Sequence, residues 1–202
     1  MSERRGEREV WADFDEETLV VYQAYGDAIA DAALEAGRFV EPFSFGRMTW
    51  IKPSFLWMME RCGWAEKPGQ TRVLAVRLRR AGWEQALGEA ALSEPDRRVY
   101  RDVDEWQTAL ARARVRVQWD PERDLGGEKL QVRSIQVGLG RGISREYAEE
   151  WIVALEDLTP RVRALRALLR EGERDRVRRQ LPEERRYPLP AELARRLGMD
   201  PG

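Results

Sequence analysis

The sequence predicts an α+β fold: a split, mostly antiparallel sheet flanked by helices, with a helical C-terminal extension. Three observations predict it. Segments rich in β-branched and aromatic residues are interleaved with segments of helical periodicity. Several strand segments alternate apolar and polar residues, which is typical of antiparallel strands with one face in water. Beyond Pro160 the pattern becomes helical and Arg-rich, so we expect a core of residues 1–160 and an extension of residues 161–202 that packs on it.

In the first third of the chain we expect a strand, a helix, a loop and a second helix. Residues 18–25 are rich in β-formers and predict the strand. Asp27 is the expected N-cap of the first helix, and Gly37 suits the position just after its end. Residues 39–47 are expected to be a loop. The second helix is expected at 53–62, because it opens on a proline, which is favoured in a first helical turn.

The rest of the core alternates strands with helices. The expected strands are 71–78, 114–119, 132–137 and 151–155, and the expected helices are 83–92, 104–113 and 144–149. Residues 120–129 are expected to be an acidic loop. In the extension, an apolar stripe at positions 162, 165, 168 and 169 marks one face of an Arg-covered helix, and 191–197 is a last short helix.

Composition excludes several classes of protein. The 202 residues include no histidine and one cysteine, Cys62. Ser-His-Asp and Cys-His catalysis, zinc sites of His or paired Cys, axial-His haem and an intrachain disulfide are therefore excluded. Cys62 falls on the apolar stripe of helix 53–62, so we expect an inert core residue. The low cysteine content and the absence of an apolar leader predict a cytoplasmic protein, and no run approaches the ~18 apolar residues of a membrane span.

Charge is distributed unevenly along the chain. Residues 1–160 hold 23 Lys and Arg against 29 Asp and Glu, a net −6, whereas residues 161–202 hold 12 Arg against 7 acids, a net +5. Nearly all the positive charge is arginine, which either reflects base composition or serves phosphate recognition by guanidinium groups. The basic extension makes nucleic acid a candidate partner.

The stretch 47–59 carries the strongest site signal. It combines Arg47, Thr49, Lys52 and Ser54 with Trp50 and several methionines. A helix beginning at residue 53 would direct free backbone N–H groups toward these side chains, an arrangement that favours a phosphate. The alternative is a buried helix preceded by an N-cap and surface charges.

A second group lies on two expected strands. In strand 132–137, Ser134 and Gln136 share one face and could supply neutral hydrogen-bonding groups to a ligand, with Arg133 on the other face; the alternative is a face open to water. In strand 18–25, Tyr22 and Gln23 point to opposite faces. The carboxylates of 120–124 lack the spacing of a known metal loop, so no metal is expected.

Several of these stretches resemble the domain-of-unknown-function 4291 family. The likeness rests on residues 19–25, 47–59, 117–124, 133–139 and 150–157, and it covers most of residues 9–160. It implies a small cytosolic protein whose polar motif residues line one site. More distantly, the chain resembles ADP-ribosyltransferase-like domains, in which a first strand carries a polar residue, a helix ending in Gly follows, and split antiparallel strands hold NAD.

These observations lead to two functional expectations. The first is a nucleotide-handling enzyme, a transferase that uses NAD to move ADP-ribose, with a nucleotide or another phosphorylated small molecule as ligand. Its expected catalytic residues are Gln136, Ser134 and Gln23, and its expected cofactor-binding residues are Arg47, Thr49, Trp50, Lys52, Ser54, Tyr22 and Arg133. The alternative is a nucleic-acid- or protein-binding module without catalytic activity.

Overall fold

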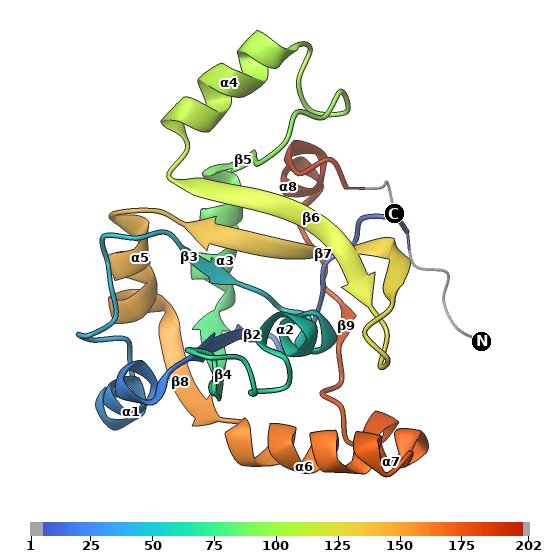
Figure 1. Ribbon diagram of the computed structural model, residues 1–202. Coiled ribbons are helices and arrows are strands. Elements are labelled where there is room, and N and C mark those ends of the chain that lie inside the picture. Colours follow the sequence, from blue (N-terminus) through green and yellow to red (C-terminus); the bar gives the residue numbers. More distant parts are fainter. Residues whose placement is uncertain (1–5, 200–202) are drawn as a thin grey trace.

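Two antiparallel-rich sheets form the centre of the molecule in the computed structural model, which describes residues 6–199 (Figure 1). One sheet has the order β2-β4-β8, the other β3-β7-β6-β5, and β1 pairs with β9 as a short ladder. Of the pairings between these strands in the described residues, only that of β5 with β6 is parallel. The strands are β1 (Trp11–Ala12), β2 (Thr18–Tyr25), β3 (Thr49–Ile51), β4 (Arg72–Arg79), β5 (Ala90–Leu92), β6 (Val115–Arg123), β7 (Lys129–Leu139), β8 (Ile152–Asp157) and β9 (Arg185–Arg186).

Helices flank both sheets, so the predicted α+β class is confirmed. They are α1 (Asp27–Ala36), α2 (Phe55–Cys62), α3 (Arg80–Gly88), α4 (Val103–Arg112), α5 (Ile143–Glu146), the π-helical turn η1 (Tyr147–Trp151), α6 (Thr159–Arg170), α7 (Arg174–Arg178) and α8 (Ala191–Arg196). Among the described residues, no helix is long and apolar enough to cross a membrane. Figure 1 shows α4 standing at one end of the molecule and α6 with α7 at the other.

The two sheets meet where β2 passes the end of β3. The backbone N–H of Tyr22 donates to the carbonyl oxygen of Lys52 at 2.7 Å. Apart from this contact the two sheets are separate hydrogen-bonded ladders, so the predicted split of the sheet is confirmed. The contact also brings Gln23, the next residue of β2, beside Thr49 on the other sheet.

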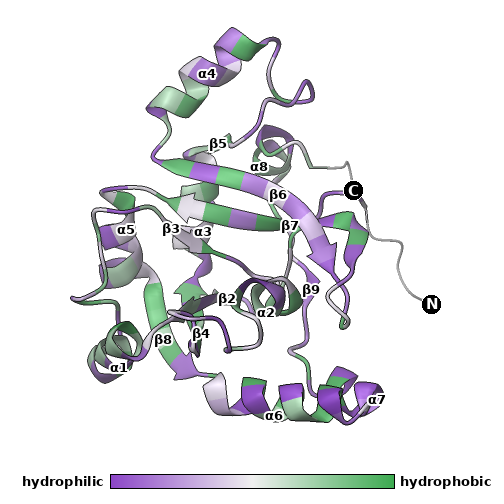
Figure 2. Cartoon of the chain, in the orientation of Figure 1, coloured by the Kyte–Doolittle hydropathy of each residue, from purple (hydrophilic) through white to green (hydrophobic). Residues whose placement is uncertain are grey.

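The alternation of strand residues decides which core each side chain enters. Leu19 and Val21 pack in a large cluster with α1, α3 and the second sheet. Val20 and Tyr22 face a smaller cluster built with α2 and α6. Figure 2 shows the same alternation of hydropathy along β6. The predicted burial of Cys62 is confirmed, since it is 0 % exposed in the smaller cluster, and burial raises the pKa of its thiol.

The starts of the first two helices differ from those predicted from the sequence, whereas the end of the first helix agrees. The first helix is capped by Gly26 rather than Asp27, which sits in the first turn without a capping hydrogen bond. The second helix begins at Phe55 with Ser54 as N-cap, not at Pro53, and its C-cap, Gly63, is left-handed (φ 59°). Gly37 is also left-handed (φ 66°), as predicted for the end of the first helix.

Two further expectations are wrong because tertiary pairing overrides local pattern. The helix expected at 83–92 ends at Gly88, because residues 90–92 pair with β6 as strand β5. The loop expected from 120 is strand as far as Arg123, with a register shift between Pro121 and Arg123. No strand was expected at residues 49–51. These residues form β3 because they pair with β7.

One glycine in α3 is required by packing. A Cβ on Gly82 would lie 2.3 Å from Cγ of Trp151, so the indole ring lies directly on the helix backbone. Trp151 ends the π-helical turn η1, whose first residue, Tyr147, reaches the seam between the sheets.

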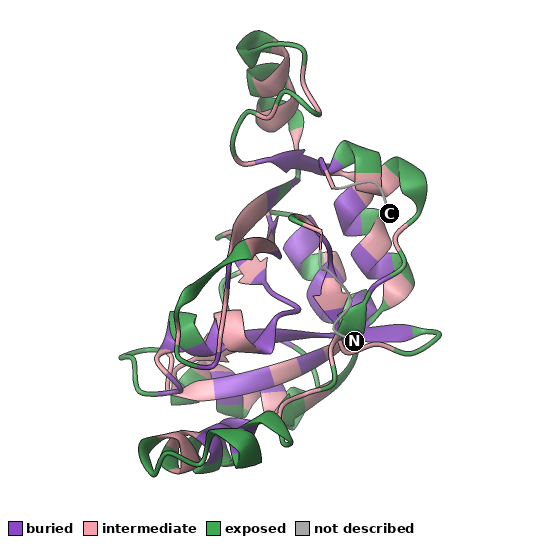
Figure 3. Ribbon diagram, turned by 90° about the vertical axis from the view of Figure 1, so that its right-hand side faces the viewer, coloured by how far each residue is buried: buried purple, intermediate pink, exposed green. Residues whose placement is uncertain are grey.

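The C-terminal segment is held against the rest of the chain. Val162 and Leu165 of α6 are fully buried in the smaller cluster. Beyond α7, the phenol of Tyr187 contacts both Arg80 and Glu84 of α3. By contrast, α4 has no buried residue, and Figure 3 shows its exposed and half-buried turns away from the body.

Candidate functional site

A pocket of about 600 Å³ opens where the two sheets meet. Its walls come from β2, α1, the 43–48 loop, β3, α2, β6 and β7, together with Gln70. Six of the ten residues predicted from the sequence line it. They are Gln23, Arg47, Thr49, Trp50, Lys52 and Gln136.

Among the described residues, the charged side chains that line the pocket are all positive. Three cations face the pocket, Arg47, Lys52 and Arg61, and no Asp or Glu does so among the described residues. This contrasts with a whole-chain net charge of −1. Four glutamine amides and four aromatic rings also line the pocket. The glutamines are Gln23, Gln70, Gln118 and Gln136, and the rings belong to Tyr25, Phe43, Trp50 and Trp57.

Lys52 is the most unusual of the three cations, because it is 5 % exposed. Its ammonium lies 4.7 Å from the ring centroid of Trp57 and forms no hydrogen bond or ion pair within residues 6–199. Burial, together with the nearby Arg61, lowers the pKa of Lys52 to about 8, although the carboxylate of Asp120 acts in the opposite direction. A buried ammonium that faces a cavity without an ion partner is well placed to meet an anion.

Gln23 is held by the protein on both sides of its amide. Its Nε2 donates to the hydroxyls of Tyr25 at 2.7 Å and Thr49 at 2.9 Å, and lies 3.3 Å from the carbonyl oxygen of Trp50. Its Oε1 accepts from the hydroxyl of Tyr147 at 2.6 Å. Burial raises the pKa of both tyrosines, so the phenols keep their protons. Gln23 therefore joins β2, β3 and η1 and sets the shape of one pocket wall.

A carboxylate lies behind the opposite wall. Asp120 accepts from Nε2 of Gln118 at 2.9 Å and from Nε2 of Gln136 at 2.6 Å. Burial raises the pKa of Asp120, while the two amides and Lys52 lower it. Both amides line the pocket, whereas Asp120 orients them from the side.

The structure does not bring Ser54 into the pocket. Ser54 Oγ accepts from Trp57 N at 3.2 Å and donates to Glu122 at 2.9 Å. The backbone N–H of Phe55 donates to the Glu184 carboxylate at 2.7 Å. The positive N-terminal end of α2, expected to hold a phosphate, is thus occupied by the protein's own side chains.

Tyr22 also lies elsewhere, because successive residues of a strand face opposite sides. Its ring packs edge-on against Phe55 in the smaller core cluster. It lines a separate cavity of about 120 Å³ together with Arg77 and Arg161.

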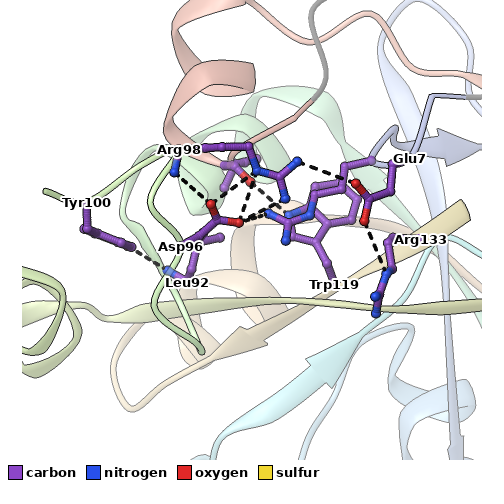
Figure 4. Close-up of polar contacts among 9 residues, drawn as sticks. Glu7, Leu92, Asp96, Arg98, Tyr100, Trp119 and Arg133 are labelled. Carbon is purple, nitrogen blue, oxygen red and sulfur yellow. Dashed lines mark hydrogen bonds and ion pairs between the residues drawn. The ribbon is translucent and has the colours of Figure 1, made fainter. Parts of the chain in front are cut away.

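Arg133 and Ser134 lie near the N-terminal segment, outside the pocket. Figure 4 shows Arg133 beside Glu7, which also faces Arg98. Arg98 in turn binds Asp96 at 3.0 Å. Ser134 lines a cavity of about 10 Å³ with Arg133 and Glu122. The shared face of Ser134 and Gln136 was predicted, but their positions along β7 place them in different cavities.

Arg61, Gln118 and Asp120 were not predicted from the sequence to belong to the site. Two signals were available. Arg61 follows Trp57 and Met58 by four and three residues, so all three share a helix face. Asp120 follows Gln118 by two residues, so it lies on the same polar face if the strand continues beyond Trp119. That pattern indicates a strand at residue 120, where a loop was expected.

Comparison with known protein families identifies the family of this chain. A family model described as Domain of unknown function (DUF4291) matches residues 9–187. No curated protein matches the chain. The matched range contains every residue that lines the pocket, and it runs past the expected boundary at residue 160.

Proposed function

The chain belongs to the family described as Domain of unknown function (DUF4291), and from its pocket we propose that it binds a nucleotide, with NAD as the candidate ligand and transfer of ADP-ribose as the reaction. The observation that carries the proposal is the charge of the pocket. Within residues 6–199, three cations and no carboxylate line it, in a chain that is otherwise slightly acidic. Such a site attracts an anion, and two arginines with a buried lysine suit phosphate oxygens.

Aromatic and amide groups extend the match from phosphate to nucleotide. Trp50 and Trp57 offer flat surfaces on which a base could stack. The glutamine amides can bond to base edges or sugar hydroxyls. A volume of about 600 Å³ falls within the ~300–1,000 Å³ typical of small-molecule sites.

The proposed reaction breaks the bond between ribose C1′ and nicotinamide and forms a bond from C1′ to an acceptor nucleophile, whose proton is released. It needs no histidine, because positioning of the reactants and charge stabilisation supply much of such a rate. In this chain Arg47, Lys52 and Arg61 would hold the pyrophosphate, and Gln136 would orient the ribose. Gln23 would act on the pocket wall, because its amide is already bonded on both sides. We place this activity in the cytoplasm, as the sequence predicts.

The alternative, nucleic-acid binding by the basic extension, has weaker support. Several of its arginines are engaged within the chain. Arg170 binds Glu66 at 2.6 Å, Arg186 lies 3.1 Å from Glu9, and Arg178 lies 2.8 Å from Asp175. These contacts reduce the basic surface that a phosphate backbone could use.

A thermal-shift series tests ligand binding. The full chain is heated with NAD, ADP-ribose, ADP or inorganic pyrophosphate. A ligand at 100 times its Kd should add about 2.7 kcal/mol to the free energy of unfolding. The double variant Arg47→Met, Arg61→Met should bind at least ~10-fold more weakly, because hydrogen bonds to charged groups contribute about 1.5–3 kcal/mol each. The exposed Arg163→Met on α6 is the matched control and should bind as the wild type does.

Catalysis is tested separately by chromatography of NAD after incubation with the protein. Release of nicotinamide that depends on Gln136 and on the two arginines supports the transfer reaction. The absence of a shift with all four compounds would refute nucleotide binding. Binding without nicotinamide release, with or without added acceptors such as protein or RNA, would restrict the proposal to binding.

A further inference from the structure

The amides of Gln118 and Gln136 form a matched pair on the sheet wall of the pocket. The two residues are directly opposite each other in the antiparallel register of β6 and β7. Opposed residues in such a ladder have Cβ atoms about 4.5–5.5 Å apart. Their side chains therefore leave the sheet together and reach the same part of the pocket.

Asp120 decides how both amides are turned. One carboxylate oxygen accepts from Gln118 Nε2 at 2.9 Å, and the other accepts from Gln136 Nε2 at 2.6 Å. Turning either amide over would place its carbonyl oxygen against a carboxylate oxygen, which repels it. Each Nε2 is thus committed to Asp120, and the Oε1 atoms accept no hydrogen bond from another residue among 6–199.

We propose that the Asp120-oriented amides of Gln118 and Gln136 present two carbonyl acceptors to the pocket and select a ligand that carries a vicinal diol, such as the ribose of a ribonucleotide. A diol offers two neighbouring O–H donors, which match two neighbouring acceptors. A carboxylate or phosphate in that position would meet acceptors only. The pocket is therefore divided between a cationic part for phosphate and a neutral acceptor part for sugar.

In this arrangement Asp120 is a positioning residue, since it acts on the ligand through the two amides. Its two carboxylate oxygens accept from the two amides, and its negative charge attracts Lys52. The inference rests on the proposed nucleotide binding and goes further, because it names the sugar group that the site distinguishes and the three side chains that distinguish it.

The test compares ADP with 2′,3′-dideoxy-ADP, which lacks both hydroxyls, and uses pyrophosphate as a diol-free anion. Calorimetry on the full-length protein gives each Kd. Two neutral hydrogen bonds of about 1 kcal/mol each predict that wild type binds ADP about 30-fold more tightly than the dideoxy compound. Pyrophosphate affinity reports on the cations alone.

Asp120→Asn replaces one carboxylate oxygen by an NH₂ group. One glutamine amide must then turn over and show the pocket a donor instead of an acceptor. Because a sugar hydroxyl can also accept from that NH₂ group, the preference for ADP should fall by no more than the roughly fivefold worth of one bond, while pyrophosphate binds at least as tightly as before. If Asp120 had only a structural role, the substitution would weaken the binding of all three ligands together.

Gln136→Met keeps the side-chain length and removes one acceptor, so it tests the idea even if Asp120→Asn fails to fold. Because methionine offers the hydroxyl no amide group, the preference should fall to about fivefold. Gln131→Met, an exposed position on the same strand, is the matched control and should keep the full preference.

Two results overturn the inference while leaving nucleotide binding intact: equal binding of ADP and dideoxy-ADP by wild type, or an unchanged preference in Gln136→Met. If neither ADP nor pyrophosphate binds, the proposed function fails and this inference fails with it.

Discussion

Replacing Lys52 by methionine should stabilise the free protein and weaken its binding of anions. Lys52 is 5 % exposed and has no ion partner in the described part of the chain. A pKa lowered from 10.5 to about 8 corresponds to about 3 kcal/mol against the charged form. The cation–π contact with Trp57 returns about 0.5–2 kcal/mol. Methionine fills a similar volume without charge, so we expect Lys52→Met to be more stable by about 1–3 kcal/mol at pH 7.

The gain should depend on pH in a defined direction. Because the folded-state pKa of Lys52 lies below its unfolded value, the unfolded state binds more protons between about pH 8 and 10.5. Stability of the wild type therefore rises with pH through that window relative to the variant. The advantage of Lys52→Met should be full below about pH 8 and shrink toward zero, or reverse, by pH 10.5.

Urea unfolding at pH 7, 9 and 10.5, without ligand, measures this difference directly. Lys67→Met, at an exposed lysine in a turn, is the matched control and should change stability by no more than ~0.5 kcal/mol. A second titration, with pyrophosphate, should show weaker binding by Lys52→Met than by wild type and unchanged binding by Lys67→Met. A variant that is less stable than wild type at pH 7, or whose stability difference does not change with pH, would refute the burial argument.

Three structural predictions complete the set, each measured by urea unfolding. Tyr147→Phe removes the donor to the buried Gln23 carbonyl and should cost about 1–3 kcal/mol; a neutral result would mean that this wall does not depend on the bond. Gly82→Ala places a Cβ 2.3 Å from the Trp151 ring and should cost at least ~1–3 kcal/mol, whereas a stabilised variant would contradict the close approach. Glu184→Ala removes the carboxylate at the start of α2 and should cost about 0.5–2 kcal/mol, with loss of helical signal; unchanged stability would argue that water replaces it.

Much of the fold could be read from local pattern. The strand at 18–25 and the helix before Gly37 have the residues that their structures favour, so their bounds were predicted almost to the residue. The short strands β3 and β5 could not be predicted in this way. Residues 49–51 and 90–92 become strands because β7 and β6 lie beside them, and that pairing joins segments far apart in the chain.

The candidate site shows the same division. Arg47, Thr49, Trp50 and Lys52 lie within one short stretch, and local composition was enough to select them. Ser54 belongs to the same stretch, but the structure engages it with Glu122, 68 residues away in sequence. A carboxylate brought from another strand cannot be foreseen from neighbours in the chain.

The sequence by itself determined which chemistry this protein can use. With no histidine and with its one cysteine on an apolar helix face, the available groups are guanidinium, ammonium, amide, hydroxyl and carboxylate. The tertiary structure alone decided which of them meet. It paired Gln118 with Gln136 across two strands, turned both amides with Asp120, and buried Lys52 with no ion pair among the described residues. Orientation and desolvation depend on atoms that are distant in the chain and close in space, so no local pattern encodes them.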